Sequence, residues 1–361
     1  MAGRRKARAK RRAPWWARIS LVFGVILTLL SGGTLAAGAI VLHKVNTSFH
    51  QETLIASGSR KTPATHASTV KGPLDVLLAG SDLRSSWKTT GEKPRTDTIM
   101  WLHISASLDQ AYLVSIPRDL VVTIPADAHT GYQGGSDRIN ASFPYGMKNV
   151  NDVAGGMQLL SKTVSKLTGA TFDMAALINW DGFKAITAAL GGVTMCLDQG
   201  FTSTQPGFPS GLTFQKGCHH YDAAKALSLV RQRYNVPGGD YGRQQLQQQF
   251  IKQILKQATS RGVVTNPAKL NAVISAAGKS FTLDLGGYSI TDLALALHNI
   301  TAENITTLQP PHSSLYYGGV YSGESFTQPI ANQLFAAMRD DTVDQFILKH
   351  PSLVTKQPGT S

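Results

Sequence analysis

The sequence predicts an α/β fold that follows one membrane-spanning helix at the N-terminus. An uncharged, largely apolar run covers residues 19–42, and about 20 apolar residues are enough to span a bilayer. Helical patterns at residues 151–168 and 180–190 follow a strand-rich region. The strands of that region are predicted from three short apolar runs, Leu74–Ala79, Ile99–Ile104 and Ala111–Ile116.

The positive charge of the chain is concentrated at its beginning. The 361 residues are 42% hydrophobic and carry a formal net charge of +13, which ordinarily suggests nucleic acid or an anionic membrane as a partner. Eight Lys and Arg residues and no acidic residue lie within residues 1–18, so little net charge remains for the rest of the chain. A nucleic-acid partner is therefore not indicated.

The flanks of the apolar run predict its orientation. Trp15 and Trp16 precede it and Lys44 follows it; tryptophans favour the membrane interface, and the side richer in Lys and Arg faces the cytoplasm. We expect a single-pass anchor in the cell membrane, in contact with lipid, with residues 1–18 cytoplasmic and the rest outside. A cleaved signal peptide is the alternative, because Ala37 to Ala39 resembles a cleavage site, but the run is long for one.

Beyond the anchor we expect a tether, one domain and an extension. Residues 43–72 are rich in Ser, Thr, His and Pro and predict a flexible tether. Residues 73–312 predict the extracytoplasmic domain. Further helical patterns at 266–277 and 289–300 precede a strand at 305–308. Residues 313–361 predict an extension with a short helix at 329–339 and a disordered tail after Asp341.

The only two cysteines, Cys196 and Cys218, lie beyond the anchor. Disulfides persist in that compartment, so we predict a bridge that closes the loop over residues 199–217 and contributes about 3 kcal/mol in the chain-entropy model. His219 and His220 follow Cys218, but the spacing is not that of a zinc site.

Three arginines surround a turn in the middle of the chain. Arg231 and Arg233 follow a helical pattern over 222–230, and after a Pro-Gly-Gly turn Asp240, an N-cap residue type, precedes Arg243 and Gln247 on one helical face. If Arg231 and Arg233 serve one ligand, the first helix must end near Val230. Converging arginines favour a phosphorylated ligand; a solvated basic helix end is an equal alternative from the spacing alone.

Charged residues also follow the predicted strands. Asp82 and Arg84 come after the first strand, Asp97 precedes the second, and Arg118 and Asp119 follow the third. Ligands of open α/β folds gather at such strand ends. The chain has no Gly-rich dinucleotide fingerprint and no P-loop, so a nucleotide cofactor is not supported.

Taken in order, six motifs resemble the LytR-CpsA-Psr family of bacterial envelope proteins. They cover about residues 74–312 and lie at 80–84, 95–98, 115–119, 138–141, 189–193 and 231–245. The resemblance implies a three-layer α/β/α fold with a central mixed β-sheet. It also implies an enzyme that transfers a glycopolymer from a polyprenyl-pyrophosphate carrier to a hydroxyl of peptidoglycan, leaving a phosphodiester link.

The resemblance also implies roles for individual residues. The pyrophosphate-binding residues are expected to be Asp82, Arg84, Arg118, Arg138, Arg231, Arg233, Arg243 and Gln247. The catalytic residues are expected to be Asp97, Arg118 and Asp240. Arg138 stands where the family more often has Lys, Leu246 where many members have Arg, and Asp222 where Gly is usual, and these departures bear on polymer specificity.

A metal ion belongs to this expectation. Asp97 and Asp82 are expected to share Mg²⁺, or Mn²⁺ in its place, with the phosphates. Asp240 or Asp119 could accept the proton of the incoming hydroxyl, but each could equally be an N-cap or an arginine's partner. The prenyl chain needs an apolar groove, although the same apolar residues are equally those of an ordinary core.

Two other functions fit part of the pattern. A non-catalytic regulator or attenuator that binds envelope polymer would need the arginines but neither Asp97 nor a metal. A prenyl-pyrophosphate hydrolase would use water in place of the sugar hydroxyl, and such pyrophosphatase activity is compatible with a transferase that lacks its acceptor.

Overall fold

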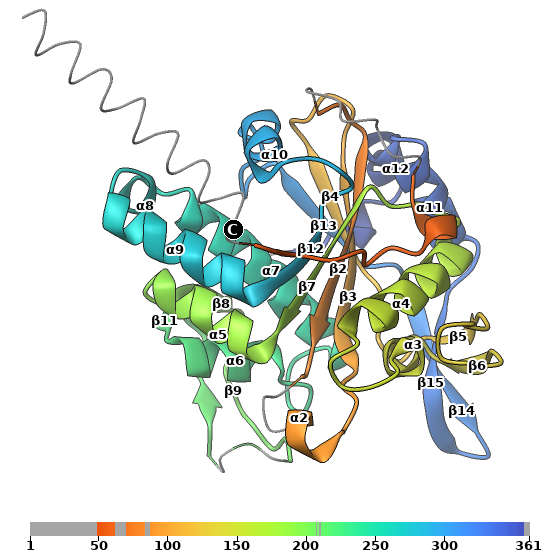
Figure 1. The fold of residues 1–361 in the computed structure, drawn as a ribbon. Coiled ribbons are helices and arrows are strands. Elements are labelled where there is room, and N and C mark those ends of the chain that lie inside the picture. The colour runs from red at the N-terminus through yellow and green to blue at the C-terminus, as the bar shows by residue number, and fades with distance from the viewer. Residues whose placement is uncertain (1–48, 62–69, 84–86, 207, 209–210, 357–361) are drawn as a thin grey trace, which may run out of the picture. The chain divides into compact units, whose positions relative to one another are not determined.

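Seven strands form one mixed sheet in the computed structural model, which describes residues 49–61, 70–83, 87–206, 208 and 211–356 (Figure 1). The strand order is β1-β12-β7-β2-β3-β4-β13. The bounds of these strands are β1 His50–Gln51, β2 Leu74–Ser81, β3 Thr96–Ile104, β4 Ala111–Ser115, β7 Met174–Asn179, β12 Phe281–Asp284 and β13 Ile305–Leu308. The expected mixed sheet is confirmed, and so are the four strands predicted within it.

The strand directions place the ends of several strands at the same edge of the sheet. β2 is parallel to β7 and antiparallel to β3, β3 is antiparallel to β4, and β4 is parallel to β13. The carboxyl ends of β2, β7, β4 and β13 therefore lie at one edge of the sheet, and β3 begins at that same edge. Ligands of open α/β sheets bind outside this kind of edge.

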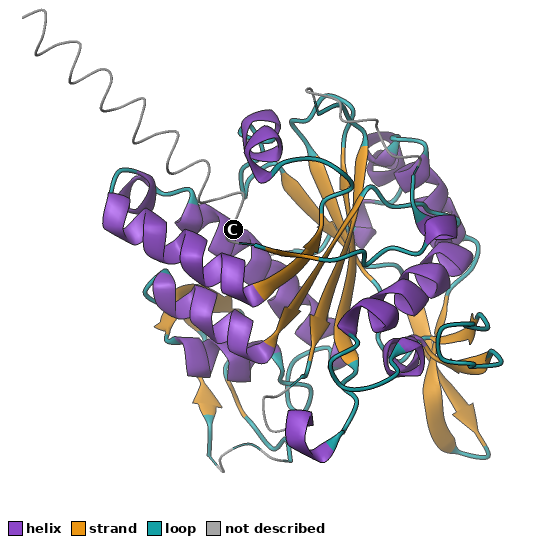
Figure 2. Ribbon diagram, viewed as in Figure 1, coloured by secondary structure: helices purple, strands orange, loops and turns teal. Residues whose placement is uncertain are grey.

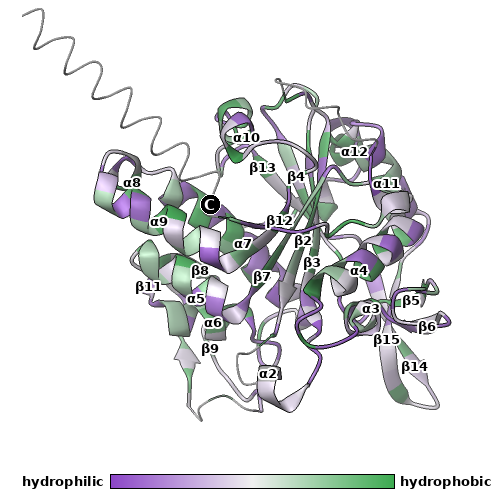
Figure 3. Ribbon diagram, viewed as in Figure 1, coloured by the Kyte–Doolittle hydropathy of each residue, from purple (hydrophilic) through white to green (hydrophobic). Residues whose placement is uncertain are grey.

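Alternate residues of the central strands pack into two different cores. Leu77 and Trp101 belong to the core under the helices α4 (Val153–Thr168), α11 (Ile330–Arg339) and α12 (Val343–Lys349). Val76 and Met100 belong to the core under α7 (Asp240–Ala258) and α10 (Ile290–Ala296). Successive side chains of a strand point to opposite faces, and both faces are covered, so hydrophobic residues recur along the central strands (Figures 2 and 3). The result is three layers, helices on either side of the sheet.

The helices begin and end at residues of the expected types. Asp152 caps α4 and Gly169 follows it with a left-handed φ of 72°, while Asp222 accepts a hydrogen bond of 2.8 Å from the Lys225 N–H at the start of α6. The α-helices are α2 Trp87–Thr90, α3 Ser142–Gly146, α4 Val153–Thr168, α5 Trp180–Ala189, α6 Ala223–Val230, α7 Asp240–Ala258, α8 Arg261–Val264, α9 Pro267–Ser280, α10 Ile290–Ala296, α11 Ile330–Arg339 and α12 Val343–Lys349. The 3-10 turns are η1 Ser57–Ser59, η2 Ile139–Ala141 and η3 Pro351–Leu353.

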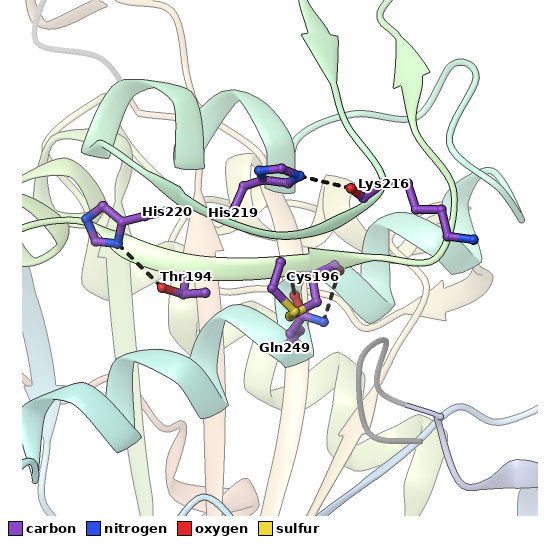
Figure 4. Close-up of a disulfide and its surroundings, with 7 residues drawn as sticks. Thr194, Cys196, Lys216, His219, His220 and Gln249 are labelled. Atoms are coloured by element: carbon purple, nitrogen blue, oxygen red, sulfur yellow. Dashed lines mark hydrogen bonds between the residues drawn. A yellow bond between two sulfur atoms is a disulfide. The ribbon is translucent and has the colours of Figure 1, made fainter.

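The disulfide joins two strands outside the central sheet (Figure 4). Strand β8 (Val193–Leu197) is antiparallel to β11 (Gly217–Tyr221), and Cys196 lies directly opposite Cys218, to which it is bonded. Between them β9 (Phe201–Thr202) pairs with β10 (Thr213–Phe214). His219 bonds the Lys216 carbonyl at 2.9 Å and His220 bonds the Gly191 carbonyl at 2.9 Å, so the two imidazoles serve separate backbone groups.

Two short hairpins lie beside the sheet edge. One consists of β5 (Val121–Ile124) and β6 (Gly135–Arg138), and the other of β14 (His312–Tyr317) and β15 (Val320–Phe326). The second hairpin projects away from the central sheet (Figure 1). Only its Gly, Ser and Tyr content was evident in the sequence, and no strand was expected there.

Two segments expected to be loose belong to the fold. Within the expected tether, Leu54 is fully buried, and the amides of Leu54 and Ile55 donate to Asp284 Oδ2 at 2.8 Å and 3.1 Å. The tail after Asp341 was expected to be disordered, which is wrong for residues 342–356. They form α12 and η3, and the Thr355 N–H donates to the Thr307 carbonyl at 2.8 Å. Both segments carry apolar residues that pack in the main core, Leu54 and Ile55 in the first and Val343 and Phe346 in the second, and this burial explains why they are ordered.

The boundary expected after residue 312 does not separate two cores. Phe326, Leu334 and Phe346 pack in the same cluster as Leu159 and Trp101. The expected cytoplasmic tail (1–18), the anchor (19–42) and the first residues of the tether lie outside the described residues. Among the residues that are described, no helix has the length and apolar character needed to cross a membrane.

A buried charge cluster fastens Lys61 and Asp341 to the central sheet. Asp75 Oδ1 accepts from Trp101 Nε1 at 2.7 Å and lies 2.8 Å from His103 Nδ1, and its Oδ2 lies 2.5 Å from Lys61 Nζ. His103 Nε2 lies 2.9 Å from Asp341 Oδ1. Burial alone would lower the pKa of His103, but Asp75 and Asp341 outweigh it and the net shift is upward. Burial would raise the pKa of Asp75, but His103 and Lys61 reverse that shift.

These shifts predict how stability depends on pH. The stabilisation from protonated His103 is complete below its ordinary pKa of 6.5 and is lost as the pH rises through the raised value. That from ionised Asp75 is present above 3.8 and is lost as the pH falls through its lowered pKa. We expect the melting temperature of purified protein to fall as the pH rises above about 6.5. His103→Gln should flatten this dependence and exposed His298→Gln should keep it; an unchanged slope in His103→Gln contradicts the assignment.

Candidate functional site

A polar pocket lies at the edge where the parallel strands end. Its volume is about 590 Å³. It is lined by Asp82, Arg95, Asp97, Arg118, Asp119, Asp137, Arg138, Asn140 and Ser322. Four of these residues, Asp82, Asp97, Arg118 and Arg138, are ones that the sequence predicted as site residues. Arg84 lies outside the described residues.

The strands determine how the pocket is assembled. Asp82 follows β2, Asp97 is the second residue of β3 and Arg118 follows β4. These three strands are neighbours in the sheet, so side chains far apart in sequence meet at one edge. Asp82 Oδ1 also accepts the Arg95 N–H at 2.8 Å and thereby fixes the loop that leads into β3.

Arg118 is the central cation of the pocket. Its Nη1 lies 2.6 Å from Asp97 Oδ1 and its Nε lies 3.5 Å from Asp119 Oδ2. Asp119 Oδ1 lies 3.5 Å from Arg138 Nη1, so one buried carboxylate holds two arginines. Burial by itself would lower the pKa of Arg118, but the charges of Asp97, Asp119 and Asp240 outweigh it and raise the pKa. Arg118 therefore stays cationic in a partly desolvated place.

A second group of charges lies at the beginning of α7. Arg243 Nη2 lies 2.9 Å from Asp240 Oδ1, Gln244 Nε2 donates to Oδ2 at 3.1 Å, and Arg233 Nε lies 3.9 Å from Oδ1. Burial would raise the pKa of Asp240, but Arg243, Gln244 and Arg118 together lower it. Gln248 of the same helix donates to Ser115 Oγ at the end of β4, so this second group lies at the same edge of the sheet as the pocket.

The geometry of Asp240 corrects one expectation and bears on another. Gly239 is the N-cap of α7 and Asp240 is its first helical residue, so Asp240 does not cap the helix. Its carboxylate instead pairs with arginines. A carboxylate with a lowered pKa is a weak base, so the contacts of Asp240 favour a positioning role over proton transfer.

Arg231 stacks on aromatic rings and is not among the residues that line the pocket. Helix α6 ends at Val230, as the arginine spacing required, and fully buried Gln232 separates Arg231 from Arg233. The Arg231 guanidinium lies over the rings of Trp180 and Phe208, 3.6 Å and 4.7 Å from their centroids. A guanidinium stacked by its face still presents N–H groups at its edge. Trp180 follows β7, so Arg231 lies at the same edge of the sheet.

Gln247 was expected beside the arginines as a substrate-binding residue. Its Nε2 donates instead to the Val230 carbonyl at 3.3 Å, at the end of α6. Gln247 thus fixes the helix end from which Arg231 and Arg233 extend. Leu246 and Phe250 of the same helix are buried.

The carboxylates of the pocket fit a cation only together with a ligand. Among the described residues, no group of three or more His, Cys, Asp or Glu could hold a metal ion on its own. Mg²⁺ in phosphate sites usually takes one or two carboxylates, with phosphate oxygens and water completing the shell. Asp97, whose side chain is 31% exposed, and Asp82 fit such a shared site.

The β14–β15 hairpin contributes pocket residues that sequence reasoning missed. Ser322 lines the pocket, its carbonyl accepts from Arg138 Nε at 3.4 Å, and Arg138 lies over the Tyr321 ring at 5.3 Å. Gly318 and Gly319 separate the two strands, and a Gly-Gly pair between strand-forming residues is a hairpin signal. That signal could have located the hairpin.

Comparisons with known proteins agree with this architecture. The chain is 32% identical over 296 residues to the cell wall biosynthesis protein LcpA of Corynebacterium glutamicum, a match that covers 74% of this chain and 55% of LcpA. It is 28% identical over 306 residues to the polyisoprenyl-teichoic acid–peptidoglycan teichoic acid transferase TagU of Oceanobacillus iheyensis, over 85% of this chain and 87% of TagU. The chain thus spans about half the length of LcpA.

A solved structure has the same fold. The crystal structure of B. subtilis TagV superposes with a TM-score of 0.57 at 22% identity, over 77% of this chain and 98% of TagV. The sequence itself matches the LytR_cpsA_psr family over residues 39–339. The protein is therefore a member of the LytR-CpsA-Psr family.

Proposed function

We propose that this protein transfers a glycopolymer from a polyprenyl-pyrophosphate carrier to a hydroxyl group of peptidoglycan. The observation that carries the proposal is the set of paired arginines around the pocket, with Arg118 at its centre. A pyrophosphate diester carries two negative charges, and arginine matches phosphate oxygens bidentately. The family supports a role in the cell envelope, and TagU is named as a transferase that joins teichoic acid to peptidoglycan.

In this proposal the arginines bind the donor and stabilise the leaving group. An acceptor hydroxyl attacks the phosphorus that bears the glycopolymer, and its proton passes to solvent. A new phosphorus–oxygen bond forms, the bond to the bridging oxygen breaks, and polyprenyl phosphate leaves with the electron pair. The product is a phosphodiester between polymer and peptidoglycan. Phosphoryl transfer of this kind depends mainly on positioning and charge neutralisation.

Each arginine is held in place by a neighbouring side chain before the donor binds. Arg118 and Arg138 project into the pocket from the Asp119 carboxylate that they share. Arg243 and Arg233 are fixed by Asp240, and Arg231 is fixed by Trp180. Side chains held in advance lose little freedom when the ligand binds. Mg²⁺, bound by Asp97 and Asp82, would add a Lewis acid that neutralises phosphate charge.

We further propose that residues 19–42 anchor the protein in the cell membrane, with the catalytic domain outside. A lipid-linked donor lies in the membrane, so an anchor keeps the pocket near its substrate. Protease added to intact protoplasts should digest residues after 43 and spare the basic tail, as immunoblots with tail and domain antibodies would show. Protection of the domain under conditions that spare a cytosolic control protein would refute this orientation.

Replacing Arg118 tests the pyrophosphate site. Arg118→Ala should weaken binding of a prenyl pyrophosphate about ten- to a hundredfold, because a charge-assisted hydrogen bond is lost. Arg118→Lys should retain part of the affinity, since it keeps the charge but not the planar fork. Isothermal titration of the purified protein measures both, with Arg261→Ala on α8 as an exposed control. Unchanged affinity in both Arg118 variants, with normal melting curves, would exclude this pocket.

Replacing Asp97 separates catalysis from binding. Asp97→Asn should abolish Mg²⁺-dependent transfer while the metal-free affinity for prenyl pyrophosphate stays the same or rises, because a carboxylate that repels the phosphates is removed. Transfer to peptidoglycan and release of prenyl phosphate are measured side by side, with exposed Asp181→Asn as the control. Full transfer by Asp97→Asn would show the metal assignment to be wrong. Release of prenyl phosphate that is unaffected by acceptor would identify a hydrolase instead.

A further inference from the structure

The tip of the β14–β15 hairpin exposes a cluster of large apolar side chains. Among the residues that the structure describes, seven large hydrophobic side chains are markedly exposed. Four of them lie in this hairpin, Leu315, Tyr316, Tyr317 and Val320, with exposed fractions of 37%, 65%, 86% and 70%. Single exposed apolar residues are ordinary, whereas a contiguous group of them marks an interaction site.

One face of this hairpin continues into the pocket. Tyr316 lies opposite Tyr321, and their rings are 6.0 Å apart and nearly perpendicular. Arg138, which lines the pocket, lies over the Tyr321 ring at 5.3 Å. Adjacent strand residues point to opposite faces, so Tyr317 lies on the other face. Tyr316 and Tyr321 therefore form an aromatic strip that leads to the phosphate-binding arginines.

The hairpin is fixed to the segment that carries Arg118. The Glu324 N–H donates to the Asp119 carbonyl at 2.9 Å. Gly323 has a φ of 146°, and a Cβ there would lie 2.6 Å from that same carbonyl, so only glycine allows this approach. The Glu324 carboxylate, 8% exposed, accepts from Tyr321 OH at 2.9 Å and from Ser314 Oγ at 3.1 Å. These contacts fix the position of the Tyr321 ring relative to the segment that carries Arg118.

The charge of the hairpin indicates what it binds. Residues 312–326 contain no Lys or Arg, and buried Glu324 is their one acidic residue. Anionic polymers and anionic membrane surfaces are bound by clustered Lys and Arg, so an uncharged aromatic surface does not fit them. A tyrosine ring offers an apolar face with a polar tip, which matches a pyranose ring, whose C–H groups form an apolar face inside a rim of hydroxyls.

We propose that Tyr316 and Tyr321 bind the glycan strand of the peptidoglycan acceptor and align it with the pocket. This inference rests on the proposed transfer reaction. The donor is held through its pyrophosphate by the arginines, but the reacting part of the acceptor is a neutral sugar hydroxyl. The strip supplies uncharged contacts beside the phosphates, where that hydroxyl must lie.

The two faces of the hairpin provide a matched experiment on the full-length protein in detergent. The probe is a fluorescently labelled oligosaccharide of β-1,4-linked N-acetylglucosamine, the uncharged sugar of the glycan strand, and binding is measured by anisotropy. Tyr316→Ala should weaken binding about two- to tenfold, the contribution expected of one aromatic contact. Tyr316→Phe keeps the ring and should bind as the parent does. Tyr317→Ala, on the opposite face and still more exposed, should also bind normally.

Separate measurements distinguish this idea from its alternatives. Prenyl pyrophosphate affinity, measured in the same preparations, should be the same in all hairpin variants; failure of the parent protein to bind it would refute the proposed function without deciding the acceptor site. Equal glycan binding by Tyr316→Ala and the parent would overturn the acceptor assignment. Glycan binding that is weakened by Tyr317→Ala and unaffected by Tyr316→Ala would place the contact on the opposite face of the hairpin and overturn the assignment.

Discussion

The site depends on carboxylates that hold arginines close to one another. Guanidinium groups repel each other, and they stay together in a partly buried place only if opposite charges lie between them. Asp119 lies between Arg118 and Arg138, and Asp240 lies between Arg243 and Arg233. Without a ligand these two carboxylates offset part of the charge of the four arginines. A bound pyrophosphate would compete with these carboxylates for the same N–H groups. The carboxylates therefore fix the arginines in position, and a ligand must bind the arginines more strongly than the carboxylates do.

The order of the strands explains why these residues meet. Asp82, Asp97 and Arg118 come from the ends of β2, β3 and β4, which are adjacent in the sheet. Helix α7 brings Arg243 to the same edge, because buried Gln248 donates to Ser115 Oγ at 2.9 Å and to the Leu308 carbonyl at 3.0 Å. A buried amide without partners would cost stability. Gln248 therefore fixes the middle of α7 near the ends of β4 and β13.

Local signals predicted much of this structure, and longer-range packing decided the rest. The strands that include Leu77 and Trp101 are apolar runs, and α6 and α9 begin at ordinary cap residues, so these elements were predictable from sequence. Leu54 lies in a polar segment, and its burial depends on Asp284, far along the chain. The place of Gly323 against Asp119 is equally non-local. Motif resemblance identified Arg118 and Asp97, but the role of Asp240 as an arginine partner required the geometry.

The two substrates of the proposed reaction differ in chemistry, and different parts of the protein would bind them: the arginines would bind the donor and the tyrosines of the hairpin would bind the acceptor. The donor is defined by its charge, and the arginines at this edge of the sheet are held in place by Asp97, Asp119 and Asp240 before it binds. The acceptor reacts through a neutral sugar hydroxyl, and further cations beside that sugar would favour anionic competitors. The hairpin carries tyrosines and no exposed charge within a short distance of the pocket, since Arg138 contacts both the Tyr321 ring and the pocket. Arg138 thus links the two regions by contact with both.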